Sequence, residues 1–100
     1  MSAYLIVEVK VIDPVAYEQY KALAQTAIAR HGGRYLVRGG PLEVLEGRPP
    51  ASSRLVVVEF DSVEQAKLFY DSPDYRAARA ARAGAAEMNM LVVAGIDNQL

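Results

Sequence analysis

Apolar and polar residues alternate at the end of the stretch 4–11, which is rich in β-branched residues, and again over 34–38, and this period of two predicts β-strands. Two further strands are expected over the mainly apolar stretches 54–60 and 88–96. The first stretch places its apolar residues on one face: Leu5, Val7, Val9 and Val11. Its opposite face is mixed: Tyr4, Ile6, Glu8 and Lys10. Because successive side chains of a strand point to opposite sides, one face is expected to pack on a core and the other to meet solvent or a polar surface.

Helical periodicity follows the first strand. Asp13 and Pro14 supply an N-cap and a preset first turn, and apolar positions then recur at intervals of three and four. These positions are Tyr17, Tyr20, Ala24, Ala27, Ile28 and His31. Gly32 stands where a left-handed residue commonly ends a helix. The pattern therefore predicts a helix that begins at Pro14 and ends at the residue before Gly32.

A second helix is expected after the third strand. Ser62 and Gln65 fit a capping box, in which the serine accepts from the amide of Gln65 and the glutamine reaches back to the cap. Ser72 and Pro73 interrupt this helix and provide a cap and a first position for a fresh start. The continuation over 74–83 is rich in alanine, and Gly84 is a natural stop.

The segment between the second and third strands contains residues that interrupt regular structure. Gly39, Gly40 and Pro41 are expected to break or bulge the second strand, because glycine permits positive φ and proline cannot donate to a ladder. Extended structure is expected to resume over 42–46, and 47–53 has the composition of a loop.

Strand, helix, strand, strand, helix, strand is the order of the ferredoxin-like βαββαβ fold. We therefore expect one α+β domain over residues 1–100, with a four-stranded antiparallel sheet and both helices on one face. The other face combines apolar and charged residues: Tyr4, Ile6, Leu36, Leu55 and Val57 among Glu8, Lys10, Arg34, Arg38 and Glu59. An apolar surface of this kind usually marks an interaction site, so two copies are predicted to pair sheet to sheet as a dimeric α/β barrel.

Composition and charge narrow the possible functions. The net charge of −1 gives no long-range electrostatic attraction for a polyanion, so neither nucleic acid nor an anionic membrane is expected as a partner. The chain has no cysteine and only one histidine, so neither thiolate chemistry nor a metal site is expected. No cofactor is expected either. The first strand is interrupted by charges and is neither a signal peptide nor a membrane span, so a cytoplasmic protein is expected.

Arg38 beside Gly39 and Gly40 is the first candidate for ligand binding, since a guanidinium and exposed amides suit an organic anion. The alternative is an ion pair of Arg38 with Glu8, Glu43 or Glu59 that fixes the strand register.

Three groups are candidates for proton transfer. His31 could act as a general acid or base, or it could cap the carbonyls at the end of its helix. Glu8 and Glu59 could share a proton as a carboxylate pair, or each could face a cation.

Tyrosines and arginines supply weaker candidates. Tyr4 on the mixed face, and Tyr70 and Tyr75 at the helix break, could line a ligand site. Arg76, Arg79 and Arg82 recur every three residues, which is typical of a solvated helix face and lacks the aromatic platform of a nucleic-acid site.

Several short motifs together resemble a known family. They are Tyr35-Leu-Val-Arg38-Gly39-Gly40, Glu46-Gly47, Val58-Glu59-Phe60, and Tyr70-Asp-Ser72-Pro73-Asp-Tyr75 followed by Arg79. The chain resembles the small bacterial domain-of-unknown-function family 1330, of the dimeric α/β-barrel superfamily. This resemblance implies a ferredoxin-like protomer in a homodimeric barrel, and it carries no established catalytic residues.

We expect the protein to bind a small anionic or phenolic molecule in a cavity between sheet and helices. The first hypothesis adds cofactor-independent acid/base or oxygenase chemistry, with Arg38 positioning the ligand and His31 or Glu59 moving a proton. The alternative is a non-catalytic binding or stress-related module whose dimer is the working unit.

Overall fold

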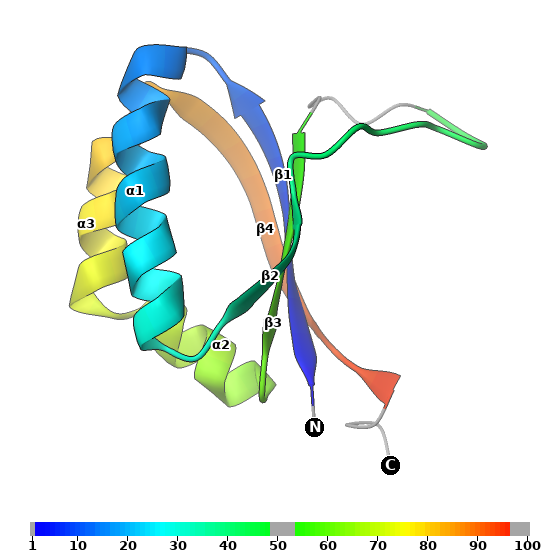
Figure 1. Ribbon diagram of the computed structural model, residues 1–100, viewed down its shortest axis with the longest axis vertical. Helices are drawn as coiled ribbons and strands as arrows, with labels where there is room; N and C mark the ends of the chain where they lie inside the picture. Colours follow the sequence, from blue (N-terminus) through cyan, green and yellow to red (C-terminus); the bar gives the residue numbers. More distant parts are fainter. Residues whose placement is uncertain (1, 49–53, 97–100) are drawn as a thin grey trace.

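The computed structural model describes residues 2–48 and 54–96, and it has the α+β architecture that the sequence predicts. Its elements are β1 (Ala3–Val11), α1 (Pro14–Arg30), β2 (Arg34–Arg38), β3 (Arg54–Phe60), α2 (Val63–Tyr70), α3 (Pro73–Ala81) and β4 (Ala86–Ala94). The strands form one antiparallel sheet in the order β2-β3-β1-β4. All three helices cover one face of this sheet, and the other face is open (Figure 1).

The core lies between the sheet and the helices. Alternate residues of β1 are buried, as the sequence pattern predicts, and α1 contributes the predicted apolar stripe. The largest fully buried side chains are Tyr75, Phe60, Phe69, Val9 and Val58. Burying each large apolar side chain stabilises a fold by about 1.5–3 kcal/mol, so these residues anchor the helices to the sheet.

Side-chain caps start all three helices where the sequence indicates. Asp13 accepts from the amide of Val15 at 3.1 Å, and Ser62 accepts from the amide of Gln65 at 3.0 Å. The second half of the expected capping box is wrong, because the Gln65 side chain donates instead to the carbonyl of His31 at 2.8 Å. Gln65 therefore ties the start of α2 to the end of α1.

A bulge in β2 changes the face on which Arg38 lies. Tyr35 pairs with Val58, but the register then shifts, so that Val37 pairs with Val57 and Arg38 with Val56. One extra residue in a strand reverses the facing of every side chain after it. The expectation that Arg38 shares the open face with Arg34 is therefore wrong: Arg38 points toward the helices and Val37 takes its place on the open face.

Beyond β2, residues 39–48 form an arm that leaves the sheet on the side away from the helices (Figure 1). The extended structure expected over 42–46 is not a strand of the sheet, and Leu45 is 96% exposed. Of the predicted loop 47–53, residues 49–53 lie outside the described residues. β4 begins and ends two residues earlier than predicted, and residues 97–100 are also outside the described chain.

The open face carries several exposed apolar side chains: Leu36, Val37, Leu91 and Val93. They extend the apolar centre formed where Ile6 lies between Val57 and Leu91 on the neighbouring strands. Within residues 2–48 and 54–96, no helix is both long and apolar enough to cross a bilayer.

Candidate functional site

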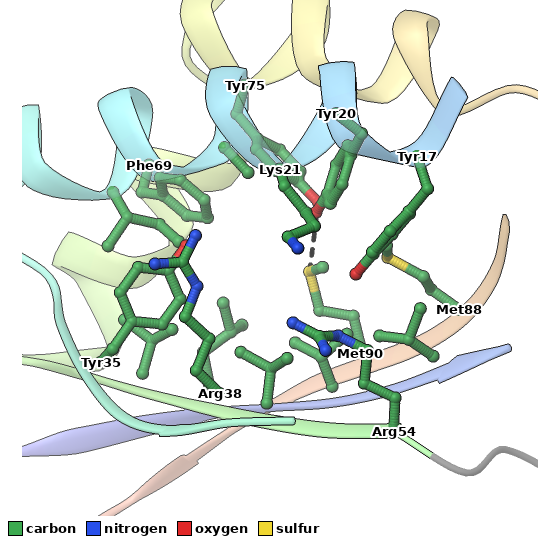
Figure 2. A pocket seen from close by; sticks show the side chains of 17 residues that line it. Tyr17, Tyr20, Lys21, Tyr35, Arg38, Arg54, Phe69, Tyr75, Met88 and Met90 are labelled. Carbon is green, nitrogen blue, oxygen red and sulfur yellow. Dashed lines mark hydrogen bonds between the residues drawn. The ribbon is translucent and has the colours of Figure 1, made fainter. Parts of the chain in front are cut away.

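A small cavity lies between the sheet and the helices α1 and α3 (Figure 2). Four tyrosines line it: Tyr17, Tyr20, Tyr35 and Tyr75. Valines of the central strands and two methionines of β4, Met88 and Met90, complete an apolar wall. Its free volume is about 30 Å³, which is room for about two water molecules.

Beside this inner cavity lies a wider hollow on the surface, of about 480 Å³. The hollow is lined mainly by polar and charged side chains: Glu18, Lys21, Gln25, Arg38 and Arg54. Lys21, Arg38 and Arg54 line both spaces, so they form the mouth between them. Three cations and one carboxylate at this point favour a negatively charged group.

Arg54 reaches the mouth because it is the first residue of β3 and pairs with Val9, whose side chain is buried in the core. Its guanidinium carbon lies 5.8 Å from the centre of the Tyr17 ring. Its Nε is buried and has no hydrogen-bond partner among the described residues. A buried donor without a partner costs about 1–3 kcal/mol, so Arg54 lies at a site that is energetically unfavourable for it as it stands.

Gly39 makes the position of Arg54 possible. Its φ is +73°, and a Cβ built on it would clash with the Arg54 guanidinium. Its amide also donates to the carbonyl of Leu55 at 2.9 Å, which holds the strand end in place. Gly40, by contrast, has open space around its Cα.

Arg38 completes the cationic mouth from β2. Its guanidinium carbon lies 4.5 Å from the centre of the Tyr35 ring, and it donates to Oε1 of Gln25 at 3.0 Å. Within the described parts of the chain, neither Arg38 nor Arg54 forms an ion pair with a carboxylate, whereas Lys21 lies 3.2 Å from Glu18. None of the three carboxylates considered for Arg38 is therefore its partner.

Two buried phenols lie at the helix side of the cavity. The hydroxyl oxygens of Tyr20 and Tyr75 are 2.7 Å apart. Burial raises the pKa of Tyr20, and the neighbouring Tyr75 raises it further. Burial also raises the pKa of Tyr75, against the lowering effect of its hydrogen bond with Tyr20 and of nearby Arg82. Both hydroxyls are thus protonated at neutral pH and can donate hydrogen bonds.

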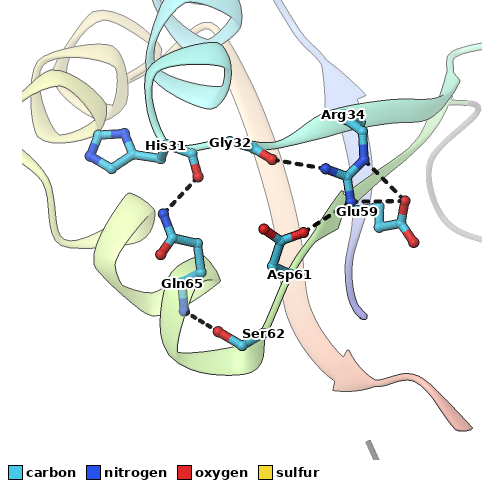
Figure 3. Close-up of polar contacts among 7 residues, drawn as sticks. All are labelled: His31, Gly32, Arg34, Glu59, Asp61, Ser62 and Gln65. Atoms are coloured by element: carbon cyan, nitrogen blue, oxygen red, sulfur yellow. Dashed lines mark hydrogen bonds and ion pairs between the residues drawn. The ribbon is translucent and has the colours of Figure 1, made fainter. Parts of the chain in front are cut away.

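The two groups proposed to move protons lie elsewhere. His31 follows the last turn of α1 (Figure 3). Its Nδ1 is 2.8 Å from the carbonyl of Ala27, and its ring contacts Phe69. Glu59 lies on the open face and forms an ion pair with Arg34 at 3.1 Å. Hydrogen bonds from Ser2 and then Arg34 lower the pKa of Glu59. Neither side chain is among those that line the cavity.

The other candidates on the open face are also separated. Tyr4 pairs with Glu59, but Glu8 pairs with Leu55, four residues further along the strand. At about 3.3 Å per residue, Glu8 and Glu59 are about 13 Å apart along the strand. The structure therefore does not bring these two carboxylates together as a proton-sharing pair.

The arginines of α3 and of its C-cap, Arg82, are less solvated than their spacing predicts. Arg79 lies over the ring of Tyr70 at 4.4 Å, and Arg82 lies 5.8 Å from the ring centre of Tyr20. Of these three side chains, Arg76 is exposed, and Arg79 and Arg82 are partly buried. Tyr70 borders a separate groove beside β4, whereas Tyr75 lines the cavity described above.

Sequence reasoning missed Arg54 and Lys21. The signal for Arg54 was its position two residues before Val56, which places it on the buried face of β3. Lys21 follows Tyr17 by four residues, which puts it on the edge of the apolar stripe of α1. In residues 2–48 and 54–96, no group of three histidine, aspartate or glutamate side chains could hold a metal ion.

Solved structures share this fold at low sequence identity. RPA0582, a protein of unknown function from Rhodopseudomonas palustris, has a TM-score of 0.72 and 19% identity over 95% of this chain and 82% of its own. SnoaB, a cofactor-independent oxygenase from Streptomyces nogalater, has a TM-score of 0.67 and 13% identity over 94% and 92%. A dimeric ferredoxin-like protein of unknown function from Jannaschia sp. CCS1 has a TM-score of 0.66 and 10% identity over 95% and 100%.

At these identities, the likeness shows a shared ferredoxin-like fold and carries no activity across. No curated protein matches the chain. The family profile of a domain of unknown function, DUF1330, matches residues 2–96, which include every element of the sheet and all three helices. The chain therefore belongs to the DUF1330 family, as its motifs predict.

Proposed function

We propose that this protein binds a small organic anion at the mouth formed by Lys21, Arg38 and Arg54. The observation that carries the proposal is that two arginines share this mouth without a carboxylate partner among the described residues. Charge-assisted hydrogen bonds from arginine to a carboxylate are about twice as strong as neutral ones. A carboxylate or phenolate would therefore be held at this point.

The apolar wall behind the mouth supports an organic rather than an inorganic anion. The tyrosine rings and the methionines of β4 offer contact area to an apolar body. The inner cavity is small as it stands, but Met88 and Met90 have flexible side chains that adapt to what they contact. The body of the ligand would lie in the outer hollow and extend inward as the methionines move.

Binding without turnover is the form of this function that the geometry supports best. His31 and Glu59, the two groups considered for proton transfer, lie outside the cavity. The fold shared with a cofactor-independent oxygenase supports the alternative, in which the ligand is converted in the same cavity. A ligand recovered unchanged after prolonged incubation in air favours binding alone, and a converted ligand favours the enzyme.

We also propose that the protein works as a homodimer joined through its open sheet face. Exposed apolar residues on β2 and β4 of this face support the proposal, because contiguous patches of this kind usually mark an interface. Solved structures with this fold from other organisms are themselves dimers. A two-fold interface would use the same face of both copies.

Isothermal titration with benzoate tests the anion site. Arg54→Leu and Arg38→Leu are each expected to weaken benzoate binding about tenfold or more, since a charged hydrogen bond contributes about 1.5–3 kcal/mol. Arg76→Leu is the matched control, because it removes an exposed arginine of α3 that does not line the mouth. Equal affinity in all four proteins would contradict the proposal, as would equal binding of neutral benzamide.

A further inference from the structure

The hydrogen bond between Tyr20 and Tyr75 is not used by the anion site. Both side chains are buried, at 7% and 0% exposure, and both line the inner cavity (Figure 2). Their oxygens are 2.7 Å apart, and the Tyr75 oxygen is 4.0 Å from the sulfur of Met90. The two phenols thus form a polar spot in an otherwise apolar chamber.

The number of protons on this pair exceeds the number of good acceptors. Two phenols carry two hydroxyl protons, and each hydroxyl can donate only one hydrogen bond. One proton lies between the two oxygens, in either direction. Within the described residues, the acceptor nearby for the second proton is the thioether of Met90, which is a weak one. Arg82, close by, has only donors and cannot accept it.

A buried hydrogen-bond donor that has only a weak acceptor lowers stability, unless a better acceptor occupies the cavity beside it. A water molecule would fit in the present free volume. An oxygen atom of a ligand would accept the same hydrogen bond. The apolar body of that ligand would then lie against the methionine side chains.

We propose that the Tyr20 and Tyr75 pair donates a hydrogen bond to a second oxygen of the ligand, remote from its anionic group. This inference rests on the proposed function and narrows its substrate class. The ligand is then an acid with two recognition points: a carboxylate held by Arg38, Arg54 and Lys21, and a carbonyl oxygen that accepts from the phenol pair. Oxo acids and acyl-substituted aromatic acids have this chemistry.

Two matched pairs of acids test the inference by isothermal titration. 4-Oxopentanoate and 4-methylpentanoate differ by a carbonyl oxygen in place of a methyl group, and 4-acetylbenzoate and 4-isopropylbenzoate repeat the difference on a longer, aromatic body. The wild-type protein is expected to bind the carbonyl acid about fivefold more tightly in at least one pair, as one neutral hydrogen bond provides.

The double variant Tyr20→Phe/Tyr75→Phe is expected to bind both acids of each pair equally. Either single variant retains one phenolic proton and is expected to keep the preference. Replacing both partners of a hydrogen bond by apolar groups of the same shape is nearly neutral for stability, so the double variant should fold. Tyr17→Phe is the control, because it removes a hydroxyl from the same cavity without touching the pair.

A wild-type protein that binds both acids of each pair equally would overturn this inference and leave the anion site standing. Loss of the preference in Tyr17→Phe alone, or its survival in the double variant, would also overturn it. Binding of none of the four acids would overturn the proposed function together with the inference.

Infrared spectroscopy of the wild-type protein provides a test that needs no variant. The carbonyl stretch of bound, ¹³C-labelled 4-oxopentanoate is expected to move to lower wavenumber than in an aprotic apolar solvent. A bound carbonyl that keeps its apolar-solvent frequency would contradict the hydrogen bond.

Discussion

At the scale of single residues, the mouth of the cavity depends on a glycine as much as on its cations. Gly39 adopts positive φ and leaves room for the Arg54 guanidinium, so the sequence Arg38-Gly39 places one arginine and accommodates another. The sequence identified Arg38 and its two glycines as a candidate site. It did not identify Arg54, because the contact between Gly39 and Arg54 joins two strands that no local pattern aligns.

Substitution at the two glycines separates their roles. Gly39→Ala is expected to lower the free energy of unfolding by about 1–3 kcal/mol, because alanine is strained at positive φ, and to weaken benzoate binding by displacing Arg54. Gly40→Ala, in open space, should change stability by less than about 0.5 kcal/mol. Urea denaturation and isothermal titration check both effects; equal behaviour of the two variants would contradict the assignment.

Glu59 gives the stability of the protein a dependence on pH. Its pKa in the folded protein is lowered, first by Ser2 and then by Arg34, so the ionised form stabilises the fold. This contribution is complete above the unfolded pKa of about 4.3 and is lost as the pH falls through the lower folded value. The stability difference between the wild type and Glu59→Gln should therefore shrink in acid.

Thermal unfolding of the two proteins at pH 7 and at pH 3 measures this difference. Glu46→Gln is the control, since Glu46 is an exposed carboxylate of the arm. A difference between wild type and Glu59→Gln that is the same at both pH values would count against a stabilising role for the Glu59 carboxylate.

At the scale of elements, periodicity, caps and composition together predict each helix and strand found in the described residues. Caps such as Asp13 and Ser62 mark helix starts because they act through neighbouring amides, which a sequence shows directly. The glycines were expected to break or bulge the second strand, and β2 does end at Arg38, directly before Gly39. The bulge that the structure shows lies earlier, between Tyr35 and Val37. Strand register depends on the partner strand, so the sequence of β2 alone could not place the bulge or the side on which Arg38 lies.

His31 belongs to this scale, because its contacts are those of a helix cap. His31→Ala removes the contact of Nδ1 with the Ala27 carbonyl and is expected to lower the free energy of unfolding by about 1 kcal/mol. Benzoate affinity should stay within about twofold of the wild type, since a cap outside the cavity has no ligand contact to lose. An affinity loss at unchanged stability, by titration and urea denaturation, would instead place His31 in the site.

At the scale of the whole molecule, the sheet separates two surfaces with different roles. The helix side contains the cavity, and the open side contains the apolar face proposed for pairing. The sequence predicted both surfaces from the alternation of its strands. It assigned the charged residues to one surface only, since the bulge that moves Arg38 across the sheet is invisible to a simple period of two.

Ile6→Asp tests the proposed dimer interface, because Ile6 lies between Val57 and Leu91 at the centre of the open face. An unpaired charge buried there should raise the dimer dissociation constant at least about tenfold. Val15→Asp, at an 85% exposed position of α1 on the other side, is the control. Sedimentation equilibrium distinguishes them; a wild-type monomer at micromolar concentration would contradict the interface.

Methyl NMR locates the organic anion most directly. In protein labelled with ¹³C at the methionine methyl groups, the signals of Met88 and Met90 report on the inner wall of the cavity. Benzoate is expected to shift both signals through its ring current, and sodium chloride at the same ionic strength is expected to leave them in place. The shifts should be much smaller in Arg54→Leu at the same benzoate concentration. Unchanged Met88 and Met90 signals at saturating benzoate would contradict binding at this site.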